Sequence, residues 1–307
     1  MHEIRLDEMT TLRDWVRWGA SRFSEAGLSF GHGCDNALDE ALALVLYAVH
    51  LDHSLPADFL DCRVSNAESA LIRTLFERRI DERLPVAYLI GKATFAGLEF
   101  EVDESVLIPR SPIAELIEEG FAPWLDADRV TSVLDMCCGS GCIGIACAHV
   151  FTEALVDLVD ISPSALEIAA RNVERHALED RIRTLRSDVF SALDDERYDL
   201  IVSNPPYVSS AEMATLPAEY RHEPALALEA GSDGMDVVAR ILVDGADYLN
   251  PDGIIVVEVG ASADLLIARY PDIPFLWLDF ERGGDGVFLL TAEQLGEYRD
   301  VFLEALE

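Results

Sequence analysis

The chain has 307 residues, of which half are hydrophobic, and it carries a formal net charge of −34. This length and apolar content allow two domains with hydrophobic cores and exclude a disordered tail. An acidic surface repels phosphate backbones, which argues against direct, broad nucleic-acid binding. No run of about 18 apolar residues predicts a membrane span, and residues 1–7 lack the basic and apolar regions of a signal peptide. We expect a cytoplasmic protein with no membrane partner.

Two interpretations of the acidity stay open. The surplus of carboxylates could attract a basic protein substrate, or it could form a solvated coat suited to a salty cytoplasm. Lys92 is the only lysine, and the remaining strongly basic side chains are all arginines. That bias favours an adaptation of the whole surface over the needs of one binding site.

Six cysteines raise the question of a metal site. Cys138 and Cys142 have the spacing of the first two ligands of an iron–sulfur triad, but Ile145 stands where the third cysteine would fall. The chain also lacks a CxxC pair and an HExxH motif. We predict reduced, mostly buried thiols and no metal.

Residues 1–84 predict an N-terminal helical domain. Apolar residues recur at near-helical spacing in segments 12–23, 37–51 and 67–83. Ser65 or Asn66 could cap the third helix. The segments contain no catalytic constellation, so we expect a small helical bundle that serves substrate recognition.

Residues 85–108 predict a β-hairpin linker. Segments 85–92 and 95–102 indicate two strands with glycine turns. The following segment, 107–112, leads into a helix that we expect from Ile113 to Phe121.

Beyond about residue 130, predicted strands and helices alternate, which is typical of a doubly wound, mainly parallel sheet. We expect strands at 130–135, 155–160, 182–187, 198–203 and 254–259, and helices at 142–150, 163–176, 234–249 and 262–270. Two final strands, 275–278 and 286–290, have no helix between them, so one should run antiparallel as a terminal hairpin. Residues 109–307 therefore predict an α/β, Rossmann-like domain with a seven-stranded sheet and the tail typical of class I methyltransferases.

Asn204-Pro205-Pro206-Tyr207 follows the predicted strand 198–203, at the sheet edge where open α/β proteins bind ligands. The Asn204 side-chain oxygen and the Pro205 carbonyl can each accept a hydrogen bond from a single NH2 group. The two prolines stiffen the loop, and Tyr207 offers a flat face to a planar amide or base. A plain Asn-Pro turn is the alternative, but a second motif upstream argues against it.

That second motif, Asp135-Met136-Cys137-Cys138-Gly139-Ser140-Gly141, is a strand end followed by a small-residue turn and a helix start. Gly139 and Gly141 let the backbone approach a ligand, and the N–H groups of the helix start point at it. Alone, such a loop could belong to any Rossmann nucleotide-binding protein. It lacks the complete GxGxxG and the GK[ST] of a P-loop.

Carboxylates stand at the ends of the next two predicted strands. Asp160 can accept hydrogen bonds from both ribose hydroxyls and would repel a 2′-phosphate. Asp188 is placed to accept from an adenine amino group. Acids at strand ends are common on protein surfaces, but their order on successive strands favours a ligand with adenosine and no phosphates, S-adenosylmethionine.

With these motifs in this order, nearly the whole chain resembles the PrmB/HemK family of protein N5-glutamine methyltransferases. The resemblance rests on the helical N-terminal domain, Ala87-Tyr88-Leu89, Ile108-Pro109-Arg110, the 135–141 loop and the 204–207 motif. It implies a class I S-adenosylmethionine-dependent methyltransferase fold. The family's two main substrates are peptide release factors and the third large-subunit ribosomal protein. Segments 109–115, 219–224 and 283–288 resemble the ribosomal-protein (PrmB) branch, whereas the release-factor branch usually has Thr-Glu where Ile113-Ala114 stand.

The resemblance also implies residue roles. Asp135 and the loop Cys137, Cys138, Gly139, Ser140 and Gly141 would hold the methionine part of the cofactor, with Cys138 in place of a more usual threonine. Asp160 would bind the ribose, while Asp188 and the Val189 backbone would bind adenine. Asn204 would border the cofactor and, with Pro205, Pro206 and Tyr207, hold the substrate glutamine. The cofactor product would be S-adenosylhomocysteine.

Arg110, Arg221, His222 and Glu223 are expected to be substrate-loop or loop-folding residues near the acceptor pocket, with a solvated charged turn as the alternative. A nucleic-acid amino-methyltransferase could use the same clamp on a flipped base, but it would need a basic groove that this acidic chain is poorly placed to supply. A non-enzymatic assembly factor is a third reading. For the favoured function, the substrate would be the ribosomal protein, free or within a ribosome-assembly intermediate.

Overall fold

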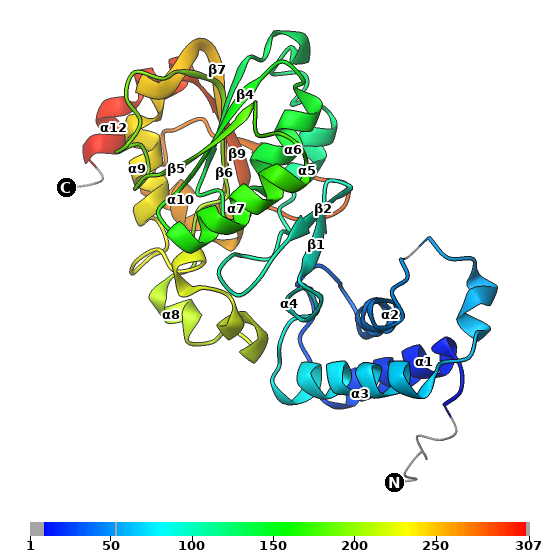
Figure 1. The fold of residues 1–307 in the computed structure, drawn as a ribbon. Helices are drawn as coiled ribbons and strands as arrows, with labels where there is room; N and C mark the ends of the chain where they lie inside the picture. Colours follow the sequence, from blue (N-terminus) through cyan, green and yellow to red (C-terminus); the bar gives the residue numbers. More distant parts are fainter. Residues whose placement is uncertain (1–8, 53, 305–307) are drawn as a thin grey trace. The chain divides into compact units, whose positions relative to one another are not determined.

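The computed structural model describes residues 9–52 and 54–304, so the segment 1–7 considered above lies outside it. Its contacts divide the chain into two compact units. One comprises Met1–Lys92 together with Pro217–His222, and the other comprises Ala93–Leu216 together with Glu223–Glu307. Figure 1 traces both along the chain. No helix within the described ranges is long and apolar enough to cross a membrane.

The helical unit contains the three predicted helices, α1 (Leu12–Glu25), α2 (Ala37–Ala48) and α3 (Asn66–Asp81). Thr11 and Ser65 begin α1 and α3 with capping boxes, in which the side chain and the third helical residue satisfy each other's backbone N–H groups. Trp15, Phe23 and Phe76 pack as a fully buried aromatic cluster between them. A 3₁₀ turn, η2 (Ala57–Asp61), precedes α3.

A buried ion cluster holds the segment Pro217–His222 in this unit. Arg79 is fully buried and pairs with Glu40, with Nε 2.7 Å from Oε2. Glu219, on η4 (Ala218–His222), is also buried and accepts from the Ser29 backbone N–H at 3.0 Å. Its carboxylate lies 3.4 Å from both Arg79 and Arg83. The segment that follows the 204–207 motif is therefore fastened by charge as well as by chain connectivity.

The predicted hairpin is only partly correct. Its strands are β1 (Lys92–Phe95) and β2 (Leu98–Glu101), and the predicted first strand at 85–92 is wrong because Val86–Ile90 forms a short helix, α4. Pro85 precedes this helix with φ −55°, and Gly91 ends it in the left-handed region at φ 72°. Proline at the start and glycine at the end outweighed the strand preference of Val86, Tyr88 and Ile90.

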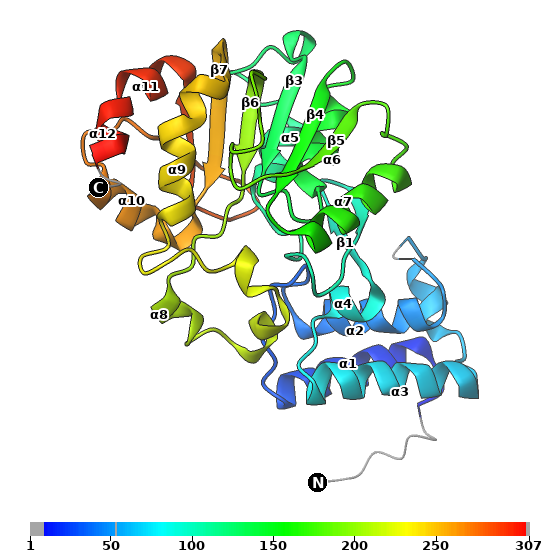
Figure 2. The same cartoon turned by 60° about the vertical axis from the view of Figure 1, so that its left-hand side comes forward.

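The second unit is built on a seven-stranded sheet with the order β5-β4-β3-β6-β7-β9-β8, of which Figure 2 shows β7, β6, β3, β4 and β5 side by side. The strands are β3 (Ser132–Met136), β4 (Leu155–Asp160), β5 (Ile182–Arg186), β6 (Tyr198–Ser203), β7 (Leu249–Glu258), β8 (Leu276–Leu278) and β9 (Val287–Thr291). Adjacent strands from β5 to β7 are parallel, and β9 is antiparallel to both of its neighbours. The predicted doubly wound sheet with a terminal antiparallel hairpin is confirmed.

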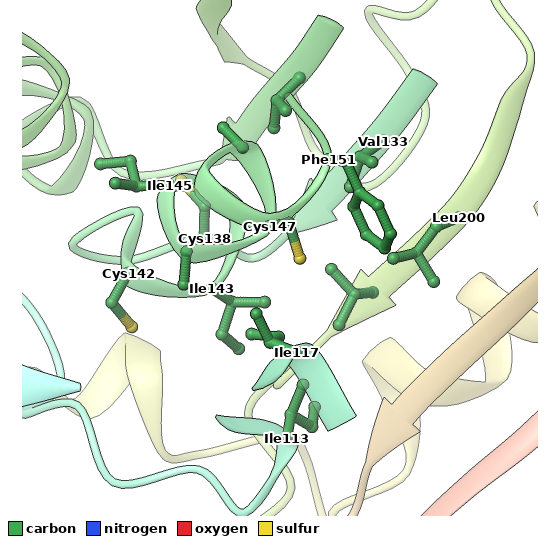
Figure 3. Packing of buried hydrophobic residues seen from close by; sticks show 14 of the residues in the cluster. Ile113, Ile117, Val133, Cys138, Cys142, Ile143, Ile145, Cys147, Phe151 and Leu200 are labelled. Carbon is green, nitrogen blue, oxygen red and sulfur yellow. The ribbon is translucent and has the colours of Figure 1, made fainter. Parts of the chain in front are cut away.

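Helices cover both faces of the sheet. On one face, α5 (Ile113–Glu118), α6 (Cys142–Val150) and α7 (Pro163–Arg175) bury side chains against β3, β4 and β6. Figure 3 shows Ile113, Ile117 and Ile143 from α5 and α6 in the cluster that contains Val133 and Leu200. The other face carries α9 (Asp236–Asp244), α10 (Ala263–Arg269), α11 (Ala292–Glu297) and α12 (Arg299–Glu304). The helix predicted at 234–249 is shorter, because α9 gives way to the 3₁₀ turn η6 (Gly245–Tyr248).

Two helical glycines provide a matched test of packing in the intact protein. A Cβ added at Gly19 in α1 would lie 2.5 Å from the Phe76 ring, whereas a Cβ at Gly296 in α11 meets nothing within 4 Å. We expect Gly19→Ala to lower the free energy of unfolding by about 1–3 kcal/mol through overpacking. Gly296→Ala should raise it by up to about 1 kcal/mol through helix propensity. Chemical denaturation of both variants measures this, and a stabilised Gly19→Ala would contradict the packing described for α1 and α3.

Candidate functional site

Strand register brings the predicted site residues to one edge of the sheet. Met136 at the end of β3 is paired with Val159 on β4 and with Ser203 on β6. Because these strands are parallel, the residues that follow them emerge side by side at their carboxyl ends. The glycine loop, Asp160 and Asn204 therefore share this edge although they are far apart in sequence.

A cavity of about 330 Å³ opens at this edge, which lies within the size range of small-molecule sites. Ten of the predicted residues line it: Cys137, Cys138, Gly139, Ser140, Asp160, Asp188, Val189, Asn204, Pro206 and Arg110. Seven do not: Asp135, Gly141, Pro205, Tyr207, Arg221, His222 and Glu223. Further lining comes from segments that the motifs did not indicate, among them Val106, Leu107, Leu226, Glu229 and Arg240.

The loop between β3 and α6 adopts a strained, left-handed course. Cys137, Gly139 and Gly141 all have positive φ, at 61°, 54° and 77°. A Cβ at Gly141 would come within 2.9 Å of Leu158, so the turn needs glycine for space as well as for φ. Gly139 has open space beside it. Ser140, which is buried, has no nitrogen or oxygen partner for its Oγ in the described part of the chain, so a ligand in the cavity would satisfy it.

Asp160 holds this loop in place from the neighbouring strand. Its Oδ2 accepts from the Gly139 N–H at 2.9 Å, and its Oδ1 accepts from the Ser162 N–H at 2.8 Å. Burial raises the pKa of this carboxyl, and those two backbone hydrogen bonds oppose the rise. A carboxylate has about four acceptor sites, so Asp160 can also accept from a hydroxyl group of a ligand.

Asp135 lies beneath the loop rather than on the cavity wall. Its Oδ2 accepts from the Gly144 N–H at 2.8 Å, which ties the end of β3 to the first turn of α6. The side chain is buried and Oδ1 has no hydrogen-bond partner among the described residues. Burial, followed by the nearby Asp160 charge, raises the pKa of Asp135 to about 8. Asp135 therefore shapes the loop without facing the cavity.

At the other end of the cavity, Asp188 pairs with Arg240 at 2.8 Å. Val189 follows with φ 52°, an unusual conformation for a β-branched residue and one that tends to occur at functional sites. Arg240 lies on α9, about fifty residues later in the chain, so no local pattern linked it to the Asp188 motif.

The Asn204 to Tyr207 motif divides into two parts. Asn204 and Pro206 line the cavity, and the Asn204 side chain makes no hydrogen bond within the described chain. Tyr207 is instead fastened behind it: its hydroxyl donates to Glu258 at 3.0 Å, and its carbonyl accepts from Ser262 Oγ at 2.9 Å. Glu258, at the end of β7, carried no sequence signal beyond being the last acidic residue of a predicted strand.

The four predicted substrate-loop residues fall in different places. Arg110 lines the cavity and pairs with buried Glu223, at 2.5 and 2.8 Å. Glu223 also accepts from the Ile108 N–H, so it folds the loop rather than facing a ligand. His222 lies in the helical unit, where its Nε2 is 2.8 Å from the Glu82 carbonyl, and Arg221 is exposed there.

The six cysteines are free thiols, three of them buried. Burial raises the pKa of Cys142 to about 12. Within the described ranges, no cluster of three or more His, Cys, Asp or Glu side chains is placed to hold a metal ion.

Comparisons with known proteins identify relatives of this chain. Residues 119–220 match the family model of the methyltransferase small domain. A ribosomal protein uL3 glutamine methyltransferase of Francisella tularensis is 48% identical over 298 residues, covering 97% of this chain and 95% of that protein. Its counterpart in Bordetella pertussis is 50% identical over 296 residues, covering 96% and 99%. One in Xanthomonas campestris is 50% identical over 290 residues, covering 94% of each. The predicted fold class, a class I methyltransferase domain with N-terminal helices, is confirmed.

The raised pKa of Asp135 predicts how stability varies with pH. An unfolded aspartate titrates at about pH 4, whereas in the folded protein the carboxyl of Asp135 keeps its proton up to about pH 8. Folding takes up a proton between these values, so the free energy of unfolding falls as pH rises through this window, by up to about 1.4 kcal/mol per pH unit. Asp135→Asn removes this slope while keeping an oxygen acceptor for the Gly144 N–H.

Denaturation of the wild type and of Asp135→Asn between pH 5 and 8 measures the effect. The variant should gain stability relative to the wild type as pH rises. Asp252→Asn, a matched change at an exposed site, should give a curve parallel to that of the wild type. A parallel curve for Asp135→Asn would show that Asp135 is ionised throughout this range.

Proposed function

The chain belongs to the family of ribosomal protein uL3 glutamine methyltransferases, and we propose that it transfers a methyl group from S-adenosylmethionine to the side-chain amide nitrogen of a glutamine in uL3. One observation carries the proposal. Asn204 places an amide side chain with unused hydrogen-bonding capacity on the wall of the cavity, at the carboxyl end of the central strand β6.

The cavity has the chemistry that S-adenosylmethionine requires. Asp160 would accept from the ribose hydroxyls, while Asp188 and the Val189 backbone would bind adenine. The Oγ of Ser140, which has no nitrogen or oxygen partner among the described residues, and the backbone N–H groups of the 137–141 loop would hold the amino-acid end. When bound, this cofactor supplies an electrophilic methyl group on a positively charged sulfur.

The acceptor nitrogen needs help because its lone pair is delocalised into the amide carbonyl. Asn204 Oδ1 and the Pro205 carbonyl would each accept one N–H of the glutamine NH2 group, which orients the nitrogen and favours pyramidal geometry. These two fixed dipoles stabilise positive charge as it develops on nitrogen, because preorganised dipoles act most strongly on charge that appears in the transition state. The methylated cation is strongly acidic, so no residue of the chain has to act as a general base.

Different parts of the chain would recognise the substrate and perform the methyl transfer. We propose that the helical N-terminal domain (residues 1–84) recognises the substrate, that the segment 85–108, which contains α4 and the β1–β2 hairpin, is a linker, and that residues 109–307 perform catalysis. The substrate is uL3, free or within a ribosome-assembly intermediate, in the cytoplasm. The net charge of −34 opposes broad nucleic-acid binding.

Transfer of a labelled methyl group tests the function directly. Purified chain, labelled S-adenosylmethionine and either free uL3 or ribosomal particles should give label that survives nuclease and is lost with protease. Mass spectrometry should place a mass increase of one CH2 group on one glutamine of uL3, absent from cells that lack the enzyme. Label that nuclease removes would assign the clamp to a nucleic-acid base instead.

Asn204→Ala tests the clamp itself. Loss of one of two fixed acceptors should lower kcat by at least about a hundredfold, while the dissociation constant of S-adenosylhomocysteine changes little. Single-turnover methylation and calorimetric titration measure the two quantities. Asn250→Ala, which removes an amide at the opposite end of the sheet, serves as the matched control. Near-normal turnover by Asn204→Ala would refute the clamp.

A further inference from the structure

A buried carboxylate behind the 204–207 motif has no role in the methyl transfer proposed above. Glu258 ends β7, the strand beside β6, and is only 6% exposed. Its Oε1 accepts from the Tyr207 hydroxyl at 3.0 Å, and its Oε2 accepts from Ser111 Oγ at 2.5 Å. A buried carboxyl is costly unless donors satisfy it, so this pair of hydroxyls indicates a built arrangement.

We propose that Glu258 is a positioning residue for the acceptor site, which fixes Tyr207 and thereby the backbone that presents Asn204 and Pro205. The inference rests on the proposed methyl transfer to a glutamine amide. It adds Glu258 and Ser111 to the residues on which that transfer depends, and it changes the role of Tyr207 from a stacking surface to an anchor.

Steric contacts around Tyr207 support the role of an anchor. A Cβ at Gly260 would lie 2.8 Å from the Tyr207 ring, and a Cβ at Gly234 would lie 2.3 Å from the Tyr207 carbonyl oxygen. That carbonyl also accepts from Ser262. Tyr207 is thus held at its ring, its hydroxyl and its main chain, while it does not line the cavity. Only Pro205 and Pro206 separate it from Asn204, so a shift of Tyr207 is transmitted through this stiff pair.

Two consecutive residues, Arg110 and Ser111, hold both ends of the segment 207–223, which we call the acceptor loop. Ser111 reaches Tyr207 through Glu258, and Arg110 pairs with Glu223 sixteen residues further along the loop. Pro109 and Pro112 flank this pair and restrict its backbone. The segment 109–112 therefore sets the position of the loop at its start and near its return.

The charge of Glu258 is not what the arrangement requires. Burial raises the pKa of this carboxyl, and the hydrogen bonds from Ser111 and Tyr207 oppose that rise. A glutamine would still accept from the Tyr207 hydroxyl through Oε1 and could donate to Ser111 Oγ through Nε2. Glu258→Gln should therefore retain activity if Glu258 positions Tyr207. It should lose activity if Glu258 acts as an acid or a base.

Four variants of the full chain test the proposal: Tyr207→Phe, Glu258→Ala, Glu258→Gln and Ser111→Ala. Tyr207→Phe keeps the aromatic face and removes only the hydroxyl. We expect Tyr207→Phe and Glu258→Ala each to lower kcat/KM for uL3 about ten- to a hundredfold, with Ser111→Ala smaller. The double variant Tyr207→Phe/Glu258→Ala should lose no more kcat/KM than the more impaired single variant. The kcat/KM of Glu258→Gln should stay within about threefold of the wild-type value. Binding of S-adenosylhomocysteine should be unchanged in all of them.

Hydrogen exchange supplies a readout that does not depend on the substrate. Backbone amides of residues 207–210 should exchange faster in Tyr207→Phe and Glu258→Ala than in the wild type and Glu258→Gln, at equal thermal stability of the rest of the chain. Normal activity and exchange in Tyr207→Phe, or additive losses in the double variant, would overturn the proposal. If Glu258→Gln is as inactive as Glu258→Ala, the carboxylate acts chemically and positioning is refuted. If the wild type does not methylate uL3 but the variants show the predicted exchange pattern, the proposed substrate is refuted and the positioning role of Glu258 is not.

Discussion

Parallel pairing of β3 with β4 and β6 is the constraint from which the site follows. The register that places Met136 beside Val159 and Ser203 delivers the glycine loop, Asp160 and Asn204 to the same edge. β3 and β6 are buried along most of their length, and a slip of one residue would turn the side chains of a strand to the opposite face. The cores packed by α6 and α9 therefore fix the glycine loop, Asp160 and Asn204 relative to one another.

Carboxyl groups near the cavity are satisfied mostly by uncharged donors. Asp160 and Asp135 accept from backbone N–H groups, and Glu258 accepts from two hydroxyls. Arginines instead pair with acids that hold segments together, as in the Arg79 and Arg110 contacts. Backbone and hydroxyl donors thus hold the residues at the strand ends, while charge pairs hold the longer segments around them.

Much of the fold could be predicted from the sequence because local patterns determine it. The strands β4 and β6 and the helix α6 have the predicted bounds, since apolar runs there end at turn-forming or polar residues. The strand prediction for segment 85–92 is wrong because a five-residue stretch of Val, Ala, Tyr, Leu and Ile is compatible with both a strand and a helix. Only the Pro and Gly at its ends favour the helix. The motif residues on the strand ends were found for the same local reason. Arg240 and Glu258 were missed because their partners lie about fifty residues away, and such pairs are set by the tertiary fold.

Both acceptors of the proposed clamp can be located in one structure. The measurement is a complex of the chain with S-adenosylhomocysteine and a uL3 peptide that contains the target glutamine. The account predicts the glutamine amide nitrogen within about 3 Å of both Asn204 Oδ1 and the Pro205 carbonyl oxygen, with its free side toward the cofactor sulfur. A glutamine held by other groups, with those two oxygens bonded elsewhere, would contradict it.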